Sequence, residues 1–295
     1  LALSIKHFLC CYRICITLLF FKMHARLDPP LQWKGGMIQE LFKKGSPSIV
    51  TNYRDVMLGD DAGKSSGSKI RDDIFPFALR FVGSTQYGCG WNGGETAFTH
   101  MHVRLFLDVL KACNISGALA YLDVVSAFAS MIRHILFNID EGDEAWLKSL
   151  HRAGFSAEDI DVIYKTICDI PWITEDGDLG AHCEEHCIAL AYQFYTNTWF
   201  STESLSGVIH TKRGCSAGMP LADVMFGLSM TRILDALNRT LKHSNVTSFV
   251  EANSSVFNFQ LASYHDDVVV PIVAPAPLIV NHACQAVSSA LFVFN

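Results

Sequence analysis

The stretch VFNFQLASYHDDVVVPIV, residues 256–273, decides the expected fold. Apolar and polar residues alternate from Val256 to Ser263, which is typical of a strand with one buried face. The apolar run from Val268 to Val273 predicts a second, buried strand. Between them lies the short polar segment Tyr264-His265-Asp266-Asp267. Because a tight polar turn between two strands makes a hairpin, we expect a β-hairpin with two carboxylates at its tip.

A third carboxylate ends another candidate strand. The apolar run Ala118 to Val125 contains Asp123 and leads into a helix-like stretch, Ala127 to Ile135. A carboxylate at the end of a buried strand is costly unless it is paired or binds a cation. Three carboxylates from two adjacent strands are able to hold two Mg²⁺ ions about 4 Å apart. The other aspartate doublets, Asp60-Asp61 and Asp72-Asp73, lack such an apolar hairpin.

Two further segments have the apolar spacing of helices, Phe98 to Leu110 and Ala222 to Leu241. Nearer the start, a helix-like piece, Met37 to Phe42, precedes a basic turn and a strand-like piece that ends at Asn52-Tyr53-Arg54. Gly59 to Ser68 is rich in Ser, Gly and Lys and predicts a surface loop. This loop resembles a phosphate-binding P-loop, but it has three residues between its glycines instead of four, and two of them are Asp.

Composition sets the class of protein and its compartment. The chain has 295 residues, half of them hydrophobic and 18% charged, which fits a globular protein and excludes a disordered or collagen-like one. The ten cysteines have no regular spacing, so we expect an intracellular protein, nuclear or cytoplasmic, and not a secreted one. The apolar stretch Leu1 to Phe21 is interrupted by Lys6, His7 and Arg13, so we expect no membrane span.

The net charge of −6 conceals a strong asymmetry. Residues 1–80 hold 12 Lys and Arg against 7 Asp and Glu, whereas residues 140–185 hold 3 against 13. The acidic stretch is interpreted as a solvated surface of one or two helices. The net charge therefore does not exclude a partner that is a nucleic acid, because it averages a basic region with an acidic insert.

Three smaller patterns leave alternatives open. His182, Cys183, His186 and Cys187 have the i, i+4 spacing of metal ligands on a helix, and an acidic helix face explains them equally. Cys89, Cys113 and Cys215 are interpreted as packing residues. The loop from Thr211 to Phe226 is basic and contains glycine, which leaves two interpretations. In one, Lys212 and Arg213 face the phosphate of a nucleotide, and in the other the loop is an ordinary helix entrance.

In order and spacing, these segments resemble the motif series of reverse transcriptases, specifically those of non-LTR retrotransposons. Trp33-Lys-Gly-Gly36, Lys43-Lys44-Gly45 and Asn52-Tyr53-Arg54 are similar to the fingers motifs. Gln86-Tyr-Gly88 with Glu95-Thr-Ala97 is similar to the segment before the palm. Leu122 to Phe128 resembles motif A, Thr211 to Phe226 resembles motif B, and Tyr264 to Asp267 resembles the Y-x-D-D turn of motif C.

This resemblance implies a right-hand polymerase fold of the α+β class, with a palm of antiparallel strands backed by helices and no thumb. The implied ranges are an N-terminal segment at 1–30, fingers at 31–117, and a palm at 118–295 with an acidic helical insert at about 140–200. The implied activity is RNA-directed DNA polymerisation, a nucleotidyl transfer to a primer 3′-hydroxyl with two Mg²⁺ ions, or Mn²⁺. The implied partners are an RNA template, a DNA primer and dNTPs.

The resemblance also assigns residues to roles. The catalytic residues are Asp123, Asp266 and Asp267, and the metal ligands are these three with Val124. Basic residues that contact template or triphosphate phosphates are Lys43, Lys44 and Arg54. The remaining nucleotide-binding or template-binding residues are Phe128, at the position that excludes a ribose 2′-hydroxyl, and Ala217, Gly218 and Tyr264.

The sequence departs from the family at three points. Ala217 replaces a glutamine common in motif B, Asp223 stands where proline is frequent, and the chain ends soon after motif C. These departures motivate a second hypothesis, a truncated or decayed reverse transcriptase domain that binds nucleic acid without catalysis. A third hypothesis is a metal-dependent phosphohydrolase that uses the same carboxylates.

Overall fold

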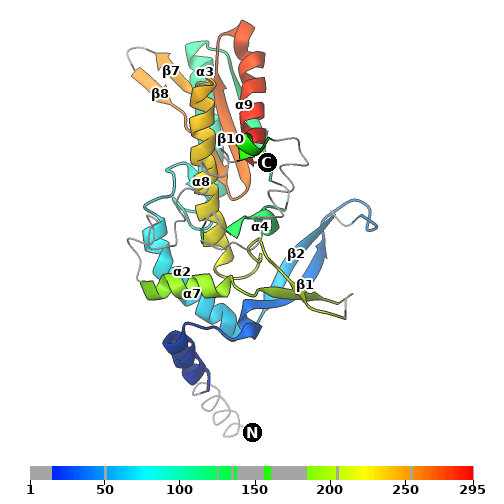
Figure 1. Ribbon diagram of the computed structural model, residues 1–295. Coiled ribbons are helices and arrows are strands. Elements are labelled where there is room, and N and C mark those ends of the chain that lie inside the picture. Colours follow the sequence, from blue (N-terminus) through cyan, green and yellow to red (C-terminus); the bar gives the residue numbers. More distant parts are fainter. Residues whose placement is uncertain are drawn as a thin grey trace, which may run out of the picture. The chain divides into compact units, whose positions relative to one another are not determined.

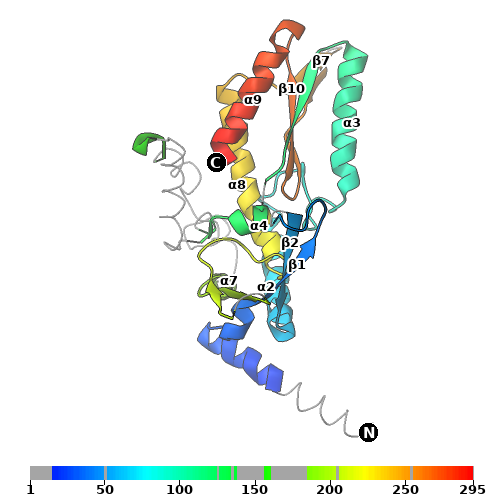
Figure 2. The same ribbon diagram turned by 90° about the vertical axis from the view of Figure 1, so that its right-hand side faces the viewer.

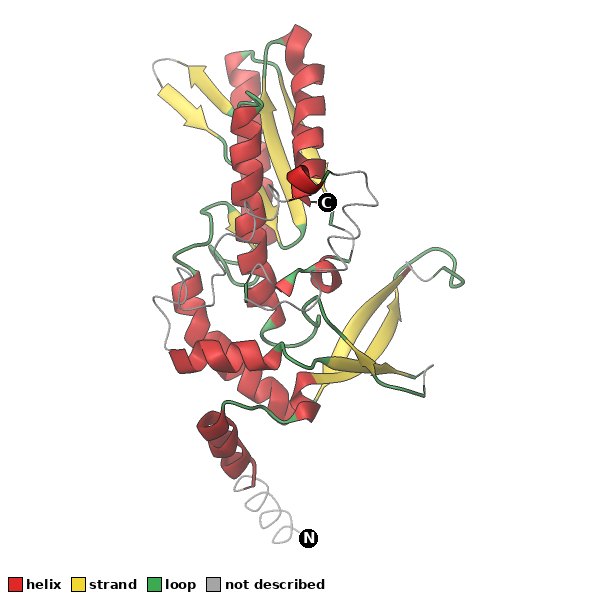
Figure 3. Ribbon diagram, in the orientation of Figure 1, coloured by secondary structure: helices red, strands yellow, loops and turns green. Residues whose placement is uncertain are grey.

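A computed structural model describes residues 15–49, 52–124, 126–133, 136–137, 156–160, 185–203, 206–252 and 255–294. The chain divides into two compact units. Unit 1 comprises Leu1–Phe77, Met131–Glu141 and Pro171–Asp223, and unit 2 comprises Ala78–Ser130, Gly142–Ile170 and Val224–Asn295. Both units combine helices with strands, which confirms the α+β class (Figure 3). The first change of unit falls at residue 78, whereas the sequence places a boundary at residue 117.

Unit 2 is built on a four-stranded sheet in the order β3-β9-β10-β4. Its strands are β3 (Gln86–Tyr87), β4 (Gly117–Leu122), β9 (Ala262–Tyr264) and β10 (Asp267–Val273). β10 is antiparallel to both β9 and β4, while the short β3 is parallel to β9. The expected hairpin is therefore confirmed, with β9 and β10 as its arms. A second, two-stranded sheet pairs β7 (Phe249–Ala252) with β8 (Ser255–Asn258).

Helices cover both faces of this sheet. Figure 2 shows β10 between α3 (Thr96–Cys113) on one side and α9 (Ile279–Phe294) on the other. α3 contacts β9 and β10, and α9 contacts β4 and β10. The side chains of Val268, Val269 and Val270 are all buried, as a continuous apolar run requires when both faces of a strand are covered. Unit 2 also contains residues 224–243 of α8 (Ala222–His243), which confirms the best of the expected helices.

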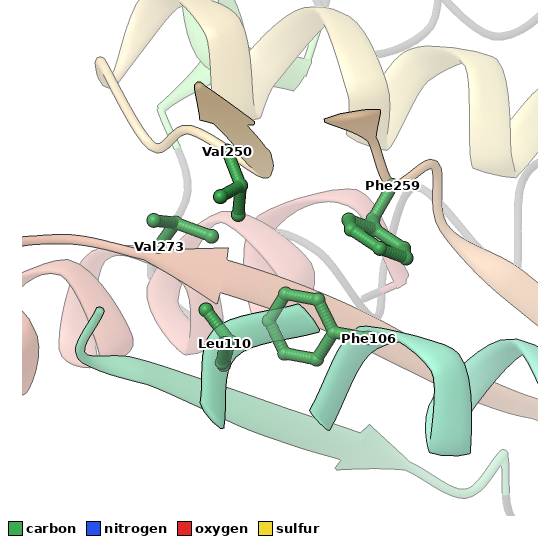
Figure 4. Packing of buried hydrophobic residues seen from close by; sticks show 5 residues of the cluster. All are labelled: Phe106, Leu110, Val250, Phe259 and Val273. Atoms are coloured by element: carbon green, nitrogen blue, oxygen red, sulfur yellow. The ribbon is translucent and has the colours of Figure 1, made fainter. Parts of the chain in front are cut away.

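The core under α3 is a cluster of aromatic and β-branched side chains (Figure 4). Phe106 and Leu110 of α3 meet Phe259, Val250 and Val273 there. The rings of Phe106 and Phe259 lie edge to face with centroids 5.1 Å apart, a favourable aromatic geometry. This packing confirms the expected helix over Phe98 to Leu110, and it fixes one face of the sheet that carries the hairpin.

Unit 1 contains a second four-stranded sheet in the order β2-β1-β5-β6. Its strands are β1 (Gly35–Phe42), β2 (Tyr53–Gly59), β5 (Trp199–Thr202) and β6 (Ile209–His210). β1 is antiparallel to β2 and parallel to β5. Its helices are a segment over residues 15–26, the short η1 (Leu31–Lys34), α2 (Asp61–Ala78) and α7 (Glu185–Phe194).

Three expectations for unit 1 are wrong. Met37 to Phe42 is strand and not helix, because β1 pairs along its length with β2 (Figure 1). The expected strand ending at residue 54 instead begins at Tyr53. The expected loop from Gly59 to Ser68 is largely the start of α2. Asp60 Oδ1 accepts hydrogen bonds from the backbone N–H groups of Ala62 and Gly63, at 2.9 and 3.1 Å, and so caps that helix.

In unit 2, three expected elements are shorter in the structure or are divided into two. The helix expected to extend to Ile135 is α4 (Ala127–Ser130), and Met131 lies outside it. The strand expected from Val256 to Ser263 is divided between β8 and β9. β4 ends at Leu122 and is only partly buried, with Tyr121 69% exposed, because it is the edge strand of its sheet. Of the acidic stretch 140–185, only 156–160 and Glu185 lie within the described residues.

Among the described helices, one segment is long and apolar enough to cross a membrane by length and composition alone. It spans Ala276–Phe294 and consists of η4 (Ala276–Leu278) and α9. In this structure α9 buries Ala286, Ala290 and Val293 where it packs on the sheet of unit 2. Most of the apolar stretch Leu1 to Phe21 lies outside the described residues.

Candidate functional site: a carboxylate hairpin in unit 2

The β9–β10 hairpin closes in a two-residue turn. Tyr264 pairs with Asp267, so His265 and Asp266 are the turn residues. His265 has a φ of 54°, whereas Asp266 is not among the residues with positive φ. Positive φ at only the first central residue is the pattern of a type II′ turn, whose twist matches that of the strands. Glycine usually occupies that position, so a histidine there needs support from its surroundings.

The strand register brings Asp123 to this hairpin. In the antiparallel pair of β10 and β4, Val268 faces Leu122. Continuing the register by one residue sets Asp123 opposite Asp267. Asp123 and Asp267 are both exposed and Asp266 is partly exposed, so all three carboxylates reach solvent. The structure therefore brings together the three aspartates that the sequence singled out, in one unit and at one end of one sheet.

The electrostatics of the cluster agree with this placement. The pKa of the Asp267 carboxyl is raised, first by partial burial and then by repulsion from the carboxylates of Asp266 and Asp123. The nearby imidazole of His265 acts in the opposite direction. A carboxyl whose pKa is raised by neighbouring carboxylates lies in a region of negative potential, which a cation relieves.

The carboxylates are suited to a hard cation by their chemistry. Oxygen ligands from Asp are those that Mg²⁺ and Mn²⁺ prefer. Within the described residues, however, no three His, Cys, Asp or Glu side chains are already arranged around a common point as a metal cage.

Phe128, the predicted steric residue, lies in α4, shortly after Asp123 in the chain. Its ring stacks on that of buried Phe226 in α8, with centroids 4.7 Å apart and planes inclined by 26°. This contact holds a partly exposed aromatic ring on the segment that follows Asp123. Val124, between the two, is also partly exposed, and Figure 1 and Figure 2 both show α4 near the turn end of β10.

Sequence reasoning missed the residues that support the hairpin from β3 and the loop after it. The buried side chain of Gln86 is fixed to α8, where its Nε2 donates to the Gly227 carbonyl at 2.7 Å and its Oε1 accepts from the Thr231 hydroxyl at 2.8 Å. The next residues along the chain reach His265: its backbone N–H donates to the Tyr87 carbonyl at 3.3 Å. Its ring Nδ1 lies 3.2 Å from Cys89 Sγ. The signal available in the sequence was Gln86-Tyr-Gly88, whose glycine has a φ of 89°.

The predicted basic residues lie in unit 1, around the end of the β1–β2 hairpin. Lys43 and Lys44 follow β1, and Arg54 in β2 pairs with Leu41. All three are exposed, and none forms an ion pair with another described residue. The loop is shaped by local hydrogen bonds, including Lys43 N–H to the Asn52 carbonyl at 2.8 Å. Unit 1 therefore presents a small, solvated basic group at this loop.

The predicted nucleotide-binding residues Ala217 and Gly218 are also in unit 1, on the segment before α8. The Ala217 carbonyl accepts a hydrogen bond from the Met57 N–H of β2 at 2.8 Å. Gly218 has a φ of 98°, and a Cβ there would lie 2.8 Å from the Met57 carbonyl oxygen. The segment thus lies against β2, and only glycine fits at residue 218.

Two side chains that the sequence did not assign hold this segment in place. Buried Arg133 donates from Nε to the Gly214 carbonyl at 2.9 Å and from Nη2 to the Thr211 hydroxyl at 3.1 Å. Arg71 of α2 makes a bidentate ion pair with Asp223, with a shortest N–O distance of 2.8 Å. This pair gives Asp223, an apparent departure from the family pattern, a structural role. The signal for Arg133 was an arginine inside an otherwise largely apolar run.

The predicted His/Cys pattern is only partly within the described residues, because His182 and Cys183 lie outside them. His186 and Cys187 are in α7. The His186 ring stacks on that of His24, with Nε2 2.8 Å from His24 Nδ1. Burial and the nearby His186 lower the pKa of the His24 imidazole. Cys187 is buried, as are Cys89 and Cys215, while Cys113 is half-buried against the α3 core.

Comparisons with known proteins add no relationship. No model of a known protein family matches this chain, and the search of curated proteins finds no significant match. The case for function therefore depends on the carboxylate hairpin and on the motif resemblance.

Proposed function

We propose that this chain is the fingers and palm of an RNA-directed DNA polymerase, a reverse transcriptase of the non-LTR retrotransposon type. The observation that carries the proposal is the hairpin of unit 2, which presents Asp266 and Asp267 beside Asp123 at one end of a helix-covered sheet. This sheet is mixed and not purely antiparallel as expected, because the short β3 runs parallel to β9. We assign unit 2 to the palm of a right-hand polymerase. Unit 1, with its basic β1–β2 loop, is assigned to the fingers.

In this mechanism each described residue has a separate task. Asp123 and Asp266 would hold two Mg²⁺ ions, supported by Asp267 and by Val124. When bound, the ions activate the primer 3′-hydroxyl and stabilise the charge of the leaving pyrophosphate. The ring of Phe128, held by its stack on Phe226, would form the wall against a ribose 2′-hydroxyl.

The remaining proposed contacts are with phosphate and base. Lys43, Lys44 and Arg54 are exposed cations, and they would neutralise triphosphate or template phosphates. Ala217 and Gly218 would present backbone to the nucleotide, as the resemblance to motif B implies. Tyr264 lies at the end of β9, directly before the turn, and it would contact the primer or the nucleotide.

A primer-extension assay tests the proposal. The purified chain is given a DNA primer on an RNA template, dNTPs and Mg²⁺, and Asp266→Asn is compared with Asp72→Asn. The control comes from the doublet on α2, is 70% exposed, and removes the same charge. We expect extension by the native chain and by Asp72→Asn and none by Asp266→Asn. Normal extension by Asp266→Asn would refute the site.

The same assay separates the second candidate function, nucleic-acid binding without catalysis. The observation that favours it is Ala217, whose methyl side chain makes no hydrogen bond to a nucleotide. This hypothesis predicts that the native chain retains labelled RNA–DNA duplex in a filter-binding assay but adds no dNTP. Release of phosphate from a small phosphoester without primer or template would instead support a phosphohydrolase.

A further inference from the structure

The catalytic hairpin has a conformation that its own sequence does not favour. His265 occupies the first turn position with a φ of 54°, where the Cβ of a non-glycine residue is crowded by the backbone. Such a conformation persists when surrounding structure determines it. The contacts around His265 therefore decide how well Asp266 and Asp267 are held.

Those contacts come from residues 87–89, which lie against the turn because β3 runs parallel to β9. The His265 N–H donates to the Tyr87 carbonyl, so the backbone of the turn is tied to the end of β3. Gly88 follows with a φ of 89°. A Cβ at Gly88 would lie 2.9 Å from His265 Cδ2 and 3.0 Å from His265 N, so the histidine fits closely against bare backbone.

Cys89 supplies the contact to the side chain of His265. Its sulfur lies 3.2 Å from Nδ1, within hydrogen-bond distance for a sulfur atom, and the tautomer of the ring sets which group donates. Cys89 is itself buried and has a φ of 51°. Its burial and its unusual backbone conformation together limit the directions in which the thiol can point. The ring of the preceding residue, Tyr264, lies perpendicular to the His265 ring, with centroids 4.8 Å apart.

The segment that carries Cys89 is firmly anchored. Gln86 is bound to Gly227 and Thr231 of α8 through two hydrogen bonds shorter than 2.9 Å. Trp91, two residues after Cys89, is fully buried and packs directly on Gly227. Because Gln86 before Cys89 and Trp91 after it both contact α8, the backbone that carries Cys89 is held in a fixed position.

We propose that Cys89 is a positioning residue of the catalytic site. Its thiol, hydrogen-bonded to His265 Nδ1, holds the histidine side chain against residues 87–89 and so holds the turn that orients Asp266 and Asp267. The proposal rests on the proposed function for its effect on catalysis, but the geometry it describes belongs to the free protein. It assigns a chemical role to a cysteine that spacing alone predicts only as packing.

The test compares Cys89→Ala, which removes the hydrogen bond, with Cys89→Ser, which retains a donor and an acceptor. Cys113→Ala is the matched control, since it removes a thiol from the α3 core of the same unit. We expect Cys89→Ala to lower kcat for dNTP addition about tenfold with KM for the primed template unchanged, because small displacements of catalytic groups are expensive. Cys89→Ser and Cys113→Ala should stay within about twofold of the native kcat.

A second readout needs no activity. Binding of Mn²⁺ alone, followed by electron paramagnetic resonance, should weaken about fivefold in Cys89→Ala and return to the native value in Cys89→Ser. The ¹⁵N signal of His265 Nδ1, assigned with His265→Gln, should shift in Cys89→Ala and stay near its native position in Cys89→Ser. A double variant of Cys89→Ala with His265→Ala should be no worse than His265→Ala alone, because both remove one interaction.

Three results would overturn the proposal: Cys89→Ser as impaired as Cys89→Ala, additive effects in the double variant, or an Nδ1 signal unchanged by Cys89→Ala. The first would show that the sulfur acts through packing. If the native chain adds no nucleotide, the proposed function fails while the Mn²⁺ and nitrogen signals still decide the role of Cys89. If the chain is active and those signals do not respond, the positioning role fails by itself.

Discussion

The packing of α3 on the sheet of unit 2 leads to a quantitative prediction for Phe106→Ala. Phe106 is fully buried, and its ring lies edge to face with that of Phe259 among Leu110, Val250 and Val273. Truncating such a residue removes its transfer free energy and leaves a cavity, which together cost about 3–5 kcal/mol. The lost aromatic pair accounts for about 0.5–1.5 kcal/mol beyond the buried area. We therefore expect a loss of about 4 kcal/mol in the free energy of unfolding.

Urea unfolding followed by circular dichroism measures this loss. With a slope of about 2 kcal/mol/M, the midpoint should fall by about 2 M. Leu105→Ala is the control, because Leu105 precedes Phe106 in α3 but is 58% exposed, and its variant should lose less than about 1 kcal/mol. Equal shifts for the two variants would refute the orientation of α3. A loss below about 1 kcal/mol for Phe106→Ala would refute the core itself.

Two further predictions concern charged side chains. The pKa of Asp267 is raised in the folded chain, so its ionised form destabilises the fold above that pKa, and the penalty disappears as the pH falls through it. Asp267→Asn should therefore raise the melting temperature at pH 7 and give no gain below the pKa of the carboxyl in the unfolded chain. A gain that persists at that pH would contradict this. Asp223→Ala should cost about 1–2 kcal/mol, because it removes the bidentate pair with partly buried Arg71. The control Asp108→Ala breaks an exposed i, i+4 pair with Arg104 and should cost less than about 0.5 kcal/mol in the same urea titration. Equal losses for the two variants would show that the Arg71 pair stabilises the fold no more than an exposed surface pair does.

Local patterns predicted the parts of the structure that depend on near neighbours. The hairpin at Tyr264 to Asp267 follows from a polar turn between two apolar runs, and the structure confirms it. Helices α3 and α8 follow from apolar residues at helical spacing and are confirmed as well. That three aspartates lie near one another was also predicted from sequence, because two lie in or next to the polar turn and the third follows an apolar run.

Other parts were decided by partners far away in the chain. Residues 37–42 become strand because β1 pairs with β2 and β5, and no property of those six residues contains that information. The start of α2 was missed for a different, local reason, because the Ser/Gly-rich composition concealed a helix that the Asp60 side chain caps. The segment with P-loop-like spacing is largely the start of a capped helix and not the expected surface loop.

The sequence by itself determined that two adjacent carboxylates lie at a polar turn between apolar runs and that a third follows another apolar run, because strand and turn preferences act over a few residues. Tertiary structure decided that Asp123 stands in register with Asp267, since strand pairing across 144 positions is set by the burial of whole strands and not by local preference. It also decided the surroundings of the turn, where Cys89 meets His265 across 176 positions. Contacts of that range depend on the packing of β3 and α8 around Gln86, which no local pattern records.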